Sequence, residues 1–164
     1  MNVLICGDSY SDETCIINKY KPTHTWVNLL RQDFEVNCVA VAGATNVEIL
    51  SQVLKNRQPW PNDVAIVSLA PIVRGDNTKN SLAAIRKITQ LKNTYVWSSF
   101  TDFKNTKDID WLPFVAYNEL HIKEQYNKEY ERRDFLFTGC HFTGAGNDAV
   151  YKHMKYILEN RSFK

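Results

Sequence analysis

The sequence predicts a three-layer α/β/α sandwich built around a doubly wound parallel sheet. Four short apolar runs are typical of strands that are buried on both faces, because such strands carry apolar residues at successive positions. Stretches with helical periodicity separate these runs, and strands joined through helices form parallel sheets. The chain of 164 residues fits one domain, residues 1–164.

Each expected strand is followed by a segment with glycine, proline or small polar residues, which is where a buried strand leaves the sheet. They lie at residues 3–6, 34–41, 64–69 and 94–97. Residues 100–110 are polar and are expected to form a loop. Residues 111–117 are compatible with either a short strand or an irregular connection.

Helices are expected between these strands and at the C-terminal end. Thr23 or Thr25 can cap a short helix that carries Trp26 on its apolar face. Thr45 and Glu48 have the capping-box spacing, so a second helix begins there and runs to about residue 57. Residues 119–132 are charged enough for an exposed helix. Two more helices are indicated by apolar side chains at helical spacing, at Leu82, Ile85, Ile88 and Leu91 and at Val150, Met154, Ile157 and Leu158.

Composition limits the classes of function. The formal net charge of +2 is too small to favour binding to nucleic acid or to an anionic membrane. No apolar run approaches the length needed to span a bilayer, and the start of the chain lacks a signal-peptide pattern, so a cytoplasmic location is expected. The four cysteines form no Cys-x-x-Cys pair, which predicts no zinc site, and because no export signal is seen their thiols are expected to be reduced.

The clearest candidate for chemistry is the turn after the first strand, Gly7-Asp8-Ser9. Ligands bind at the carboxyl ends of strands in open α/β sheets, so Ser9 is a candidate nucleophile. On these residues alone, a plain turn explains the pattern equally well. Asp8 is expected to fix the turn through hydrogen bonds rather than to take part in chemistry.

Other loops are expected to gather at the same edge of the sheet. They include Gly43 after the second strand, residues 71–77 after the third, and His141 before the last helix. A serine needs a base to take its proton, and histidine is the usual one, so Ser9 and His141 form a candidate pair. The backbone amides of Ser9 and Gly43 are candidate donors to the oxyanion that an attacked carbonyl develops.

This layout resembles the SGNH hydrolases, also called the GDSL family of esterases and lipases. The segment from Gly7 to Asp12 matches the first block of that family, and Gly43 matches the second. His141 matches the final block, as does Gly146 just after it. The resemblance spans nearly the whole chain and implies the flavodoxin-like SGNH fold, a serine esterase and no cofactor or metal.

Two positions depart from the family pattern. The third block usually carries Gly-x-Asn-Asp, whose asparagine donates to the oxyanion, but residues 68–74 contain no asparagine. The final block usually has an aspartate three residues before the histidine, where this chain has Thr138. Losing an oxyanion donor costs about 10²–10³-fold in rate, and losing the triad acid about 10⁴-fold.

Several residues are candidates to replace these groups. Asn46 can turn its amide to the oxyanion or act in helix capping, and Arg74 can bind the oxyanion or an anionic group of the substrate, or lie at the surface. Tyr10 is a further candidate for substrate contact. Asp134 or a backbone carbonyl near Thr138 can orient His141, the latter giving a Ser-His dyad.

The favoured hypothesis is a serine esterase that hydrolyses a small acyl ester, with an O-acetyl group on a carbohydrate suggested by family analogy alone. A catalytically weak or inactive binding or structural module is the main alternative, and a flavodoxin-like nucleotide or flavin domain is a third. The remaining histidines are expected at the surface or partly buried, and three of the tryptophans are expected in the core, with an acyl or sugar pocket as the alternative for the tryptophans. They are His24, His121, His153, Trp60, Trp97 and Trp111.

Overall fold

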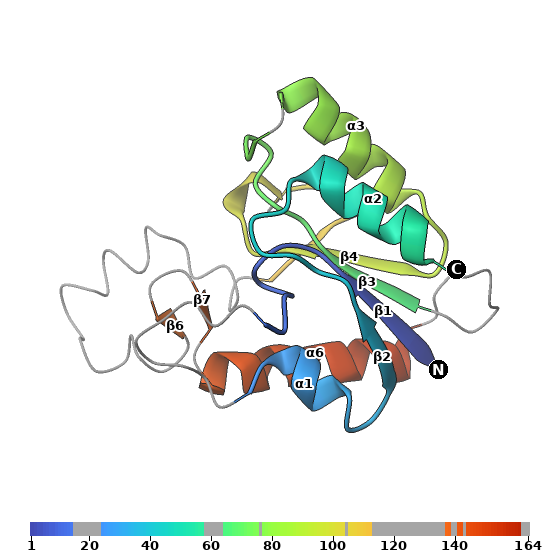
Figure 1. The fold of residues 1–164 in the computed structure, drawn as a ribbon, viewed down its shortest axis with the longest axis vertical. Coiled ribbons are helices and arrows are strands. Elements are labelled where there is room, and N and C mark those ends of the chain that lie inside the picture. The colour runs from blue at the N-terminus through green and yellow to red at the C-terminus, as the bar shows by residue number, and fades with distance from the viewer. Residues whose placement is uncertain are drawn as a thin grey trace.

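The structure is a computed structural model that describes residues 1–14, 24–57, 64–75, 77–103, 105–112, 137–138, 141–142 and 144–161. Its centre is a parallel five-stranded sheet in the order β2-β1-β3-β4-β5 (Figure 1). The strands are β1 (Asn2–Cys6), β2 (Glu35–Cys38), β3 (Val64–Ser68), β4 (Thr94–Ser98) and β5 (Asp110–Trp111). This order confirms the predicted doubly wound sheet, in which the chain reverses its direction of winding between β1 and β3.

Helices cover both faces of the sheet. The helices α2 (Asn46–Asn56) and α3 (Thr78–Thr89) pack side by side on one face, and α1 (Trp26–Leu30) and α6 (Gly144–Asn160) on the other (Figure 1). A short 3₁₀ helix, η1 (Thr101–Phe103), and an antiparallel pair of two-residue strands, β6 (Phe137–Thr138) and β7 (His141–Phe142), complete the described elements.

Strand alternation divides the core into two apolar layers. Val3 and Ile5 of β1 pack in the layer under α1 and α6, whereas Leu4 and Cys6 pack under α2 and α3. All four are at most 7% exposed, as expected for a strand covered on both sides. The predicted stripe of α6 is confirmed, since Val150, Met154, Ile157 and Leu158 are buried.

Side-chain caps fix where the two helices nearest the candidate turn begin. Thr25 caps α1, and Thr45 caps α2 in the predicted capping box. Thr45 Oγ1 accepts from the Glu48 amide at 3.3 Å, and Glu48 Oε2 accepts from the Thr45 amide at 2.8 Å. Such caps stabilise a helix by about 1 kcal/mol. Thr23, the other capping candidate, lies outside the described residues.

Some predicted boundaries are wrong in detail. The strand β2 ends at Cys38 instead of residue 41, although Val39 and Val41 still donate to the carbonyls of Ile5 and Gly7. Leu82 is 38% exposed, whereas Ser81, Ala84, Ile85 and Ile88 are the buried residues of α3.

The segment between β4 and β5 also differs from the expected loop. It contains η1, and the fifth strand begins at Asp110. The helix expected at 119–132 lies outside the described residues.

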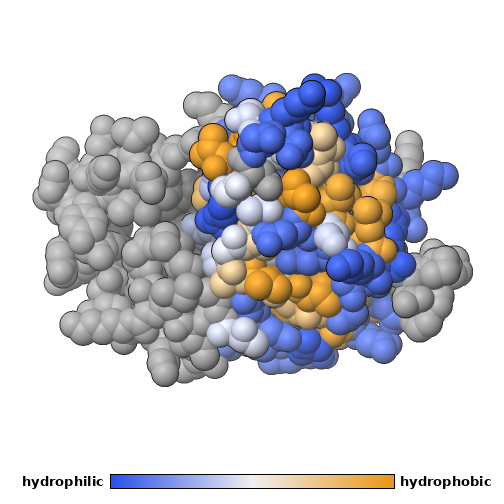
Figure 2. Space-filling model, turned by 45° about the horizontal axis from the view of Figure 1, so that its top comes forward, coloured by the Kyte–Doolittle hydropathy of each residue, from blue (hydrophilic) through white to orange (hydrophobic). Residues whose placement is uncertain are grey.

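The face formed by α2 and α3 is mixed in character. Figure 2 turns these helices toward the viewer and shows hydrophobic side chains interspersed among hydrophilic ones. Val47, Leu54 and Leu82 are among the exposed apolar residues of the two helices.

Of the helices in the described part of the chain, none has both the length and the apolar character to cross a membrane.

Candidate active site

The turn after β1 is held by Asp8. Its carbonyl accepts from the amides of Ser11 and Asp12, both at 3.0 Å, and its Oδ1 accepts from the Tyr10 amide at 3.2 Å. The Asp8 side chain is completely buried, whereas Ser9 is half-buried. Asp8 therefore fixes the turn, as predicted, and leaves Ser9 at its accessible side.

Gly7 allows the turn to lie tightly against the end of β3. A Cβ built on Gly7 would lie 1.9 Å from Ser68 Oγ, and its φ of +150° is one that residues with side chains rarely adopt. Ser68 Oγ accepts from Ser11 Oγ at 2.8 Å, and the Gln52 amide bonds both the N–H and the carbonyl of Gly7. Close packing against Ser68 therefore requires glycine at position 7.

The loop after β2 lies beside this turn. The Val41 amide donates to the Gly7 carbonyl at 3.1 Å, and the Ala42 amide donates to Asp12 Oδ2 at 2.9 Å. These bonds hold the loop containing Gly43 against the loop containing Ser9. The loops after the first two strands therefore lie at the same edge of the sheet, as the sequence predicts. Gly43 has a φ of +82° and is exposed, with open space where a Cβ would stand.

Two amides of this edge are available to a ligand. Within the described residues, neither the Ser9 N–H nor the Gly43 N–H has a protein acceptor, and the Ser9 hydroxyl has no hydrogen-bond partner. Unpaired donors beside an accessible hydroxyl are the groups that an acyl-transfer site needs.

His141 lies in β7, where its backbone is paired with Thr138 across the antiparallel ladder. The strand β7 comes just before α6, and Figure 1 shows the β6–β7 pair on the side of the molecule toward which the carboxyl end of β1 points. The side chains of His141 and Thr138, together with all of Asp134, lie outside the described residues. Contact between Ser9 and His141 therefore stays a prediction.

The side-chain amide of Asn46 forms hydrogen bonds within the protein interior. Its Nδ2 donates to the Ala70 carbonyl and to Ser81 Oγ, both at 2.9 Å, and its Oδ1 accepts from the Ala70 amide at 3.0 Å. The residue is 1% exposed. Its amide joins α2 to the loop after β3 and to α3, which does not favour the oxyanion role that the sequence leaves open.

Arg74 lies against the candidate turn. Its Nη1 donates to Asp8 Oδ2 at 2.7 Å, and its guanidinium carbon lies 5.6 Å from the centre of the Phe100 ring. Burial raises the pKa of Asp8 to about 6, and the nearby Arg74 charge lowers it in part. At neutral pH the two groups therefore form an ion pair.

Phe100 also fixes Tyr10. The two rings meet edge to face with their centres 5.6 Å apart, and the Tyr10 carbonyl accepts from the Trp26 indole at 2.7 Å. Sequence reasoning identified Arg74 and Tyr10 but missed Phe100 and the Asp8–Arg74 pair. No local pattern marks these contacts, because they join the carboxyl ends of three different strands.

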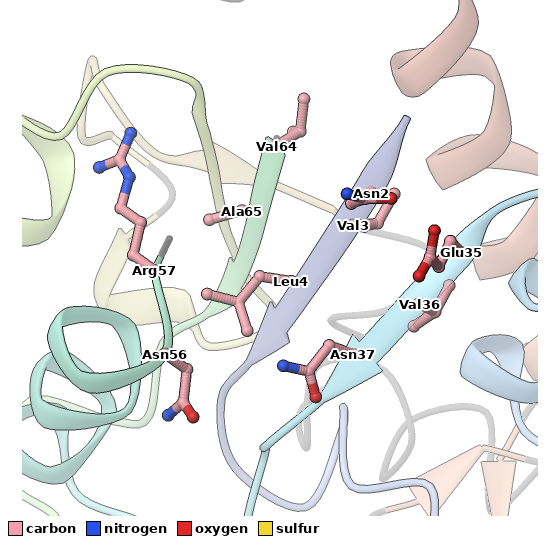
Figure 3. A pocket seen from close by; sticks show the side chains of 10 residues that line it. All are labelled: Asn2, Val3, Leu4, Glu35, Val36, Asn37, Asn56, Arg57, Val64 and Ala65. Carbon is pink, nitrogen blue, oxygen red and sulfur yellow. The ribbon is translucent and has the colours of Figure 1, made fainter. Parts of the chain in front are cut away.

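Described residues line hollows at two places, one at each end of the strands. One of about 380 Å³ is lined by the loop of Gly43 and by α2, including Glu48, Ser51 and Lys55. The other, of about 250 Å³, is lined by residues at the start of β1, β2 and β3 and the end of α2, among them Glu35, Asn37 and Asn56 (Figure 3). Only the first lies at the edge that carries Ser9.

Two other histidines have partners of their own. His24 Nε2 lies 2.9 Å from Asp148 Oδ1, and His153 Nε2 lies 3.1 Å from the Tyr95 hydroxyl. Trp97 is fully buried in the core, and the half-buried Trp111 lies on β5. His121 and Trp60 lie outside the described residues. Among the residues that the structure describes, no three His, Cys, Asp or Glu side chains cluster in a way that could hold a metal ion.

Comparison with known proteins gives a likeness of fold. The chain is similar to a crystal structure described as a member of the lipolytic protein G-D-S-L family from Veillonella parvula, with 13% sequence identity and a TM-score of 0.57. The match covers 98% of this chain and 99% of that one. No protein-family model and no curated protein matches the sequence.

Proposed function

We propose that this protein is a serine esterase that hydrolyses a small acyl ester. The observation that carries the proposal is the turn at the end of β1, where the Ser9 hydroxyl and the Ser9 and Gly43 amides lack protein partners among the described residues. The fold, shared with a lipolytic G-D-S-L protein, supports the same assignment.

In this mechanism the Ser9 hydroxyl attacks the ester carbonyl. His141 takes the serine proton and returns it to the leaving alcohol, and the two amides stabilise the oxyanion of the tetrahedral intermediate. Water, activated by His141 in its turn, then releases the acyl group. A backbone carbonyl near Thr138, or Asp134, would hold the imidazole in the required tautomer. A carbohydrate or another small alcohol would form the leaving group.

The opposing candidate is a weak or inactive module that keeps the fold for binding. It is favoured by the internal use of the Asn46 amide and by Thr138 at the position of the usual acid. The two candidates differ in turnover, since only an enzyme releases product repeatedly.

The test is ester hydrolysis and covalent labelling. The wild-type protein is expected to hydrolyse 4-nitrophenyl acetate and to react with a fluorophosphonate probe at Ser9. Ser9→Ala should abolish labelling and lower kcat by about 10³-fold or more, and His141→Ala should lower kcat to a similar degree.

The matched control is His24→Ala, which removes a histidine that pairs with Asp148 outside the proposed machinery. A wild-type protein that neither turns over nor labels would exclude the esterase and leave the binding module. Full activity in Ser9→Ala would show that another residue is the nucleophile.

A further inference from the structure

The guanidinium of Arg74 is held from two sides beside the candidate nucleophile. Nη1 is fixed by the buried Asp8 carboxylate at 2.7 Å, and the aromatic ring of Phe100 lies 5.6 Å from the guanidinium carbon. Asp8 directly precedes Ser9, and Phe100 also packs on Tyr10, which directly follows it. Of the two groups that position the charge, Asp8 therefore directly precedes the serine, and Phe100 contacts the residue that directly follows it.

Most of the hydrogen-bonding capacity of Arg74 is unused. A guanidinium has five N–H donors. Within the described residues, the Arg74 side chain donates only to Asp8, and 30% of the side chain is exposed to solvent. The remaining donors are therefore available to an acceptor that arrives from solvent.

We propose that Arg74 binds a carboxylate carried by the alcohol part of the ester substrate. This inference rests on the proposed esterase function, in which the acyl group is small and the charge must therefore lie on the alcohol side. The planar fork of arginine matches the two oxygens of a carboxylate in one plane.

The charge balance at the site favours a single negative charge over a dianion such as phosphate. Arg74 is already paired with the ionised Asp8, so the site carries no excess positive charge before substrate binds. Asp102 adds a further carboxylate nearby, since its Oδ2 accepts from the amide of Ile72 in the same loop as Arg74. Repulsion from these two carboxylates is about twice as strong for a doubly charged group as for a carboxylate, so the direct bonds to Arg74 offset it more readily for the singly charged group.

A matched pair of esters tests the proposal. The ester 4-acetoxybenzoate carries a carboxylate on its alcohol part, whereas its methyl ester is neutral and similar in shape. The wild-type protein is expected to prefer the anionic ester in kcat/KM. In Arg74→Gln, the ratio of the two kcat/KM values should fall about tenfold or more, mainly through KM of the anionic ester.

Arg161→Gln is the matched control. Arg161 also combines an ion pair, with Asp110, and a cation–π contact, with Tyr95, but it follows the C-terminal end of α6. This variant should keep the wild-type ratio. Because Arg74→Gln leaves Asp8 buried without its partner, the double variant Asp8→Asn/Arg74→Gln provides a second protein in which no unpaired charge is buried. It should show the same fall in the ratio.

Binding of the free carboxylate separates this inference from the proposed reaction. Calorimetric titration of Ser9→Ala with 4-hydroxybenzoate should show binding that weakens about tenfold in Ser9→Ala/Arg74→Gln. If no ester is hydrolysed but this difference remains, the esterase fails and the anion site stands. An unchanged ratio and unchanged binding in the Arg74 variants would overturn the inference, as would inorganic phosphate binding more tightly than 4-hydroxybenzoate.

Discussion

Asp8 and Arg74 form an ion pair, with 2.7 Å between Oδ2 and Nη1, in which the carboxylate is completely buried and the guanidinium reaches solvent. The residues are 66 positions apart in the sequence and meet because β1 and β3 are neighbours in the sheet. The pair ties the proposed nucleophile turn to the loop after β3.

Asp8 should make the stability of the protein depend on pH. Its pKa is raised from 3.8 to about 6, so the folded state binds this proton more tightly than the unfolded state does. The contribution of Asp8 to stability is present below pH 4 and is lost as the pH rises through about 6, by about 3 kcal/mol in all.

Denaturant unfolding between pH 4 and pH 7.5 measures this effect. The free energy of unfolding of wild type minus that of Asp8→Asn should decrease by about 2–3 kcal/mol across this range as the pH rises. Asp102→Asn, which changes an exposed carboxylate, is the control. A difference between wild type and Asp8→Asn that is constant with pH would contradict the raised pKa.

Gly7→Ala should destabilise the protein by about 3 kcal/mol or more, because the added methyl group meets both Ser68 Oγ and the Ser68 carbonyl. Ser68→Ala in the same background removes the nearer atom, so it should restore part of the loss. Urea midpoints of the two single variants and the double variant give the coupling. Additive losses would show that Gly7 and Ser68 do not meet as described.

Asn46→Ala should lower stability far more than catalysis. It leaves the buried N–H and carbonyl of Ala70 without their partner, at a cost of about 2–4 kcal/mol. The kcat of the folded protein should stay within about threefold of wild type, whereas removal of an oxyanion donor costs about 10²–10³-fold. Active-site titration with fluorophosphonate corrects kcat for the folded fraction, and a loss of kcat on the larger scale would restore Asn46 to the oxyanion site.

Gly43→Ala should lower catalysis more than stability. The position is open to a methyl group, so only its φ of +82° is strained, and stability should fall by about 1 kcal/mol. Ester hydrolysis should fall about tenfold or more, because relief of that strain turns the Gly43 N–H away from the oxyanion. Asn93→Ala, at another left-handed position with a φ of 49° and next to the start of β4, is the control for backbone strain. Hydrolysis that falls equally in both variants would remove the special role of Gly43.

Four of the five strands, the helices α1, α2, α3 and α6, and the turn that carries Ser9 could be predicted from the sequence. These features depend on local rules: successive apolar residues for a strand covered on both faces, helical spacing in α6, and the Thr45–Glu48 capping box of α2. Burial did not follow hydrophobicity alone in α3, where Leu82 is exposed and the polar Ser81 is buried through its bond to Asn46, although Ile85 and Ile88 of the predicted stripe are buried.

Which polar groups meet could not be predicted from the sequence. Asp8 fixes its own turn, as the sequence predicts, but it also forms an ion pair with Arg74. The side-chain amide of Asn46, a candidate donor to the oxyanion, instead donates to the Ala70 carbonyl and to Ser81 Oγ. The physical reason is that such partners are set by strand order and by the positions of separate loops. Strand order and loop positions produce no periodic pattern or fixed spacing in the sequence. Strands and helices do produce such patterns, so they can be predicted from the sequence.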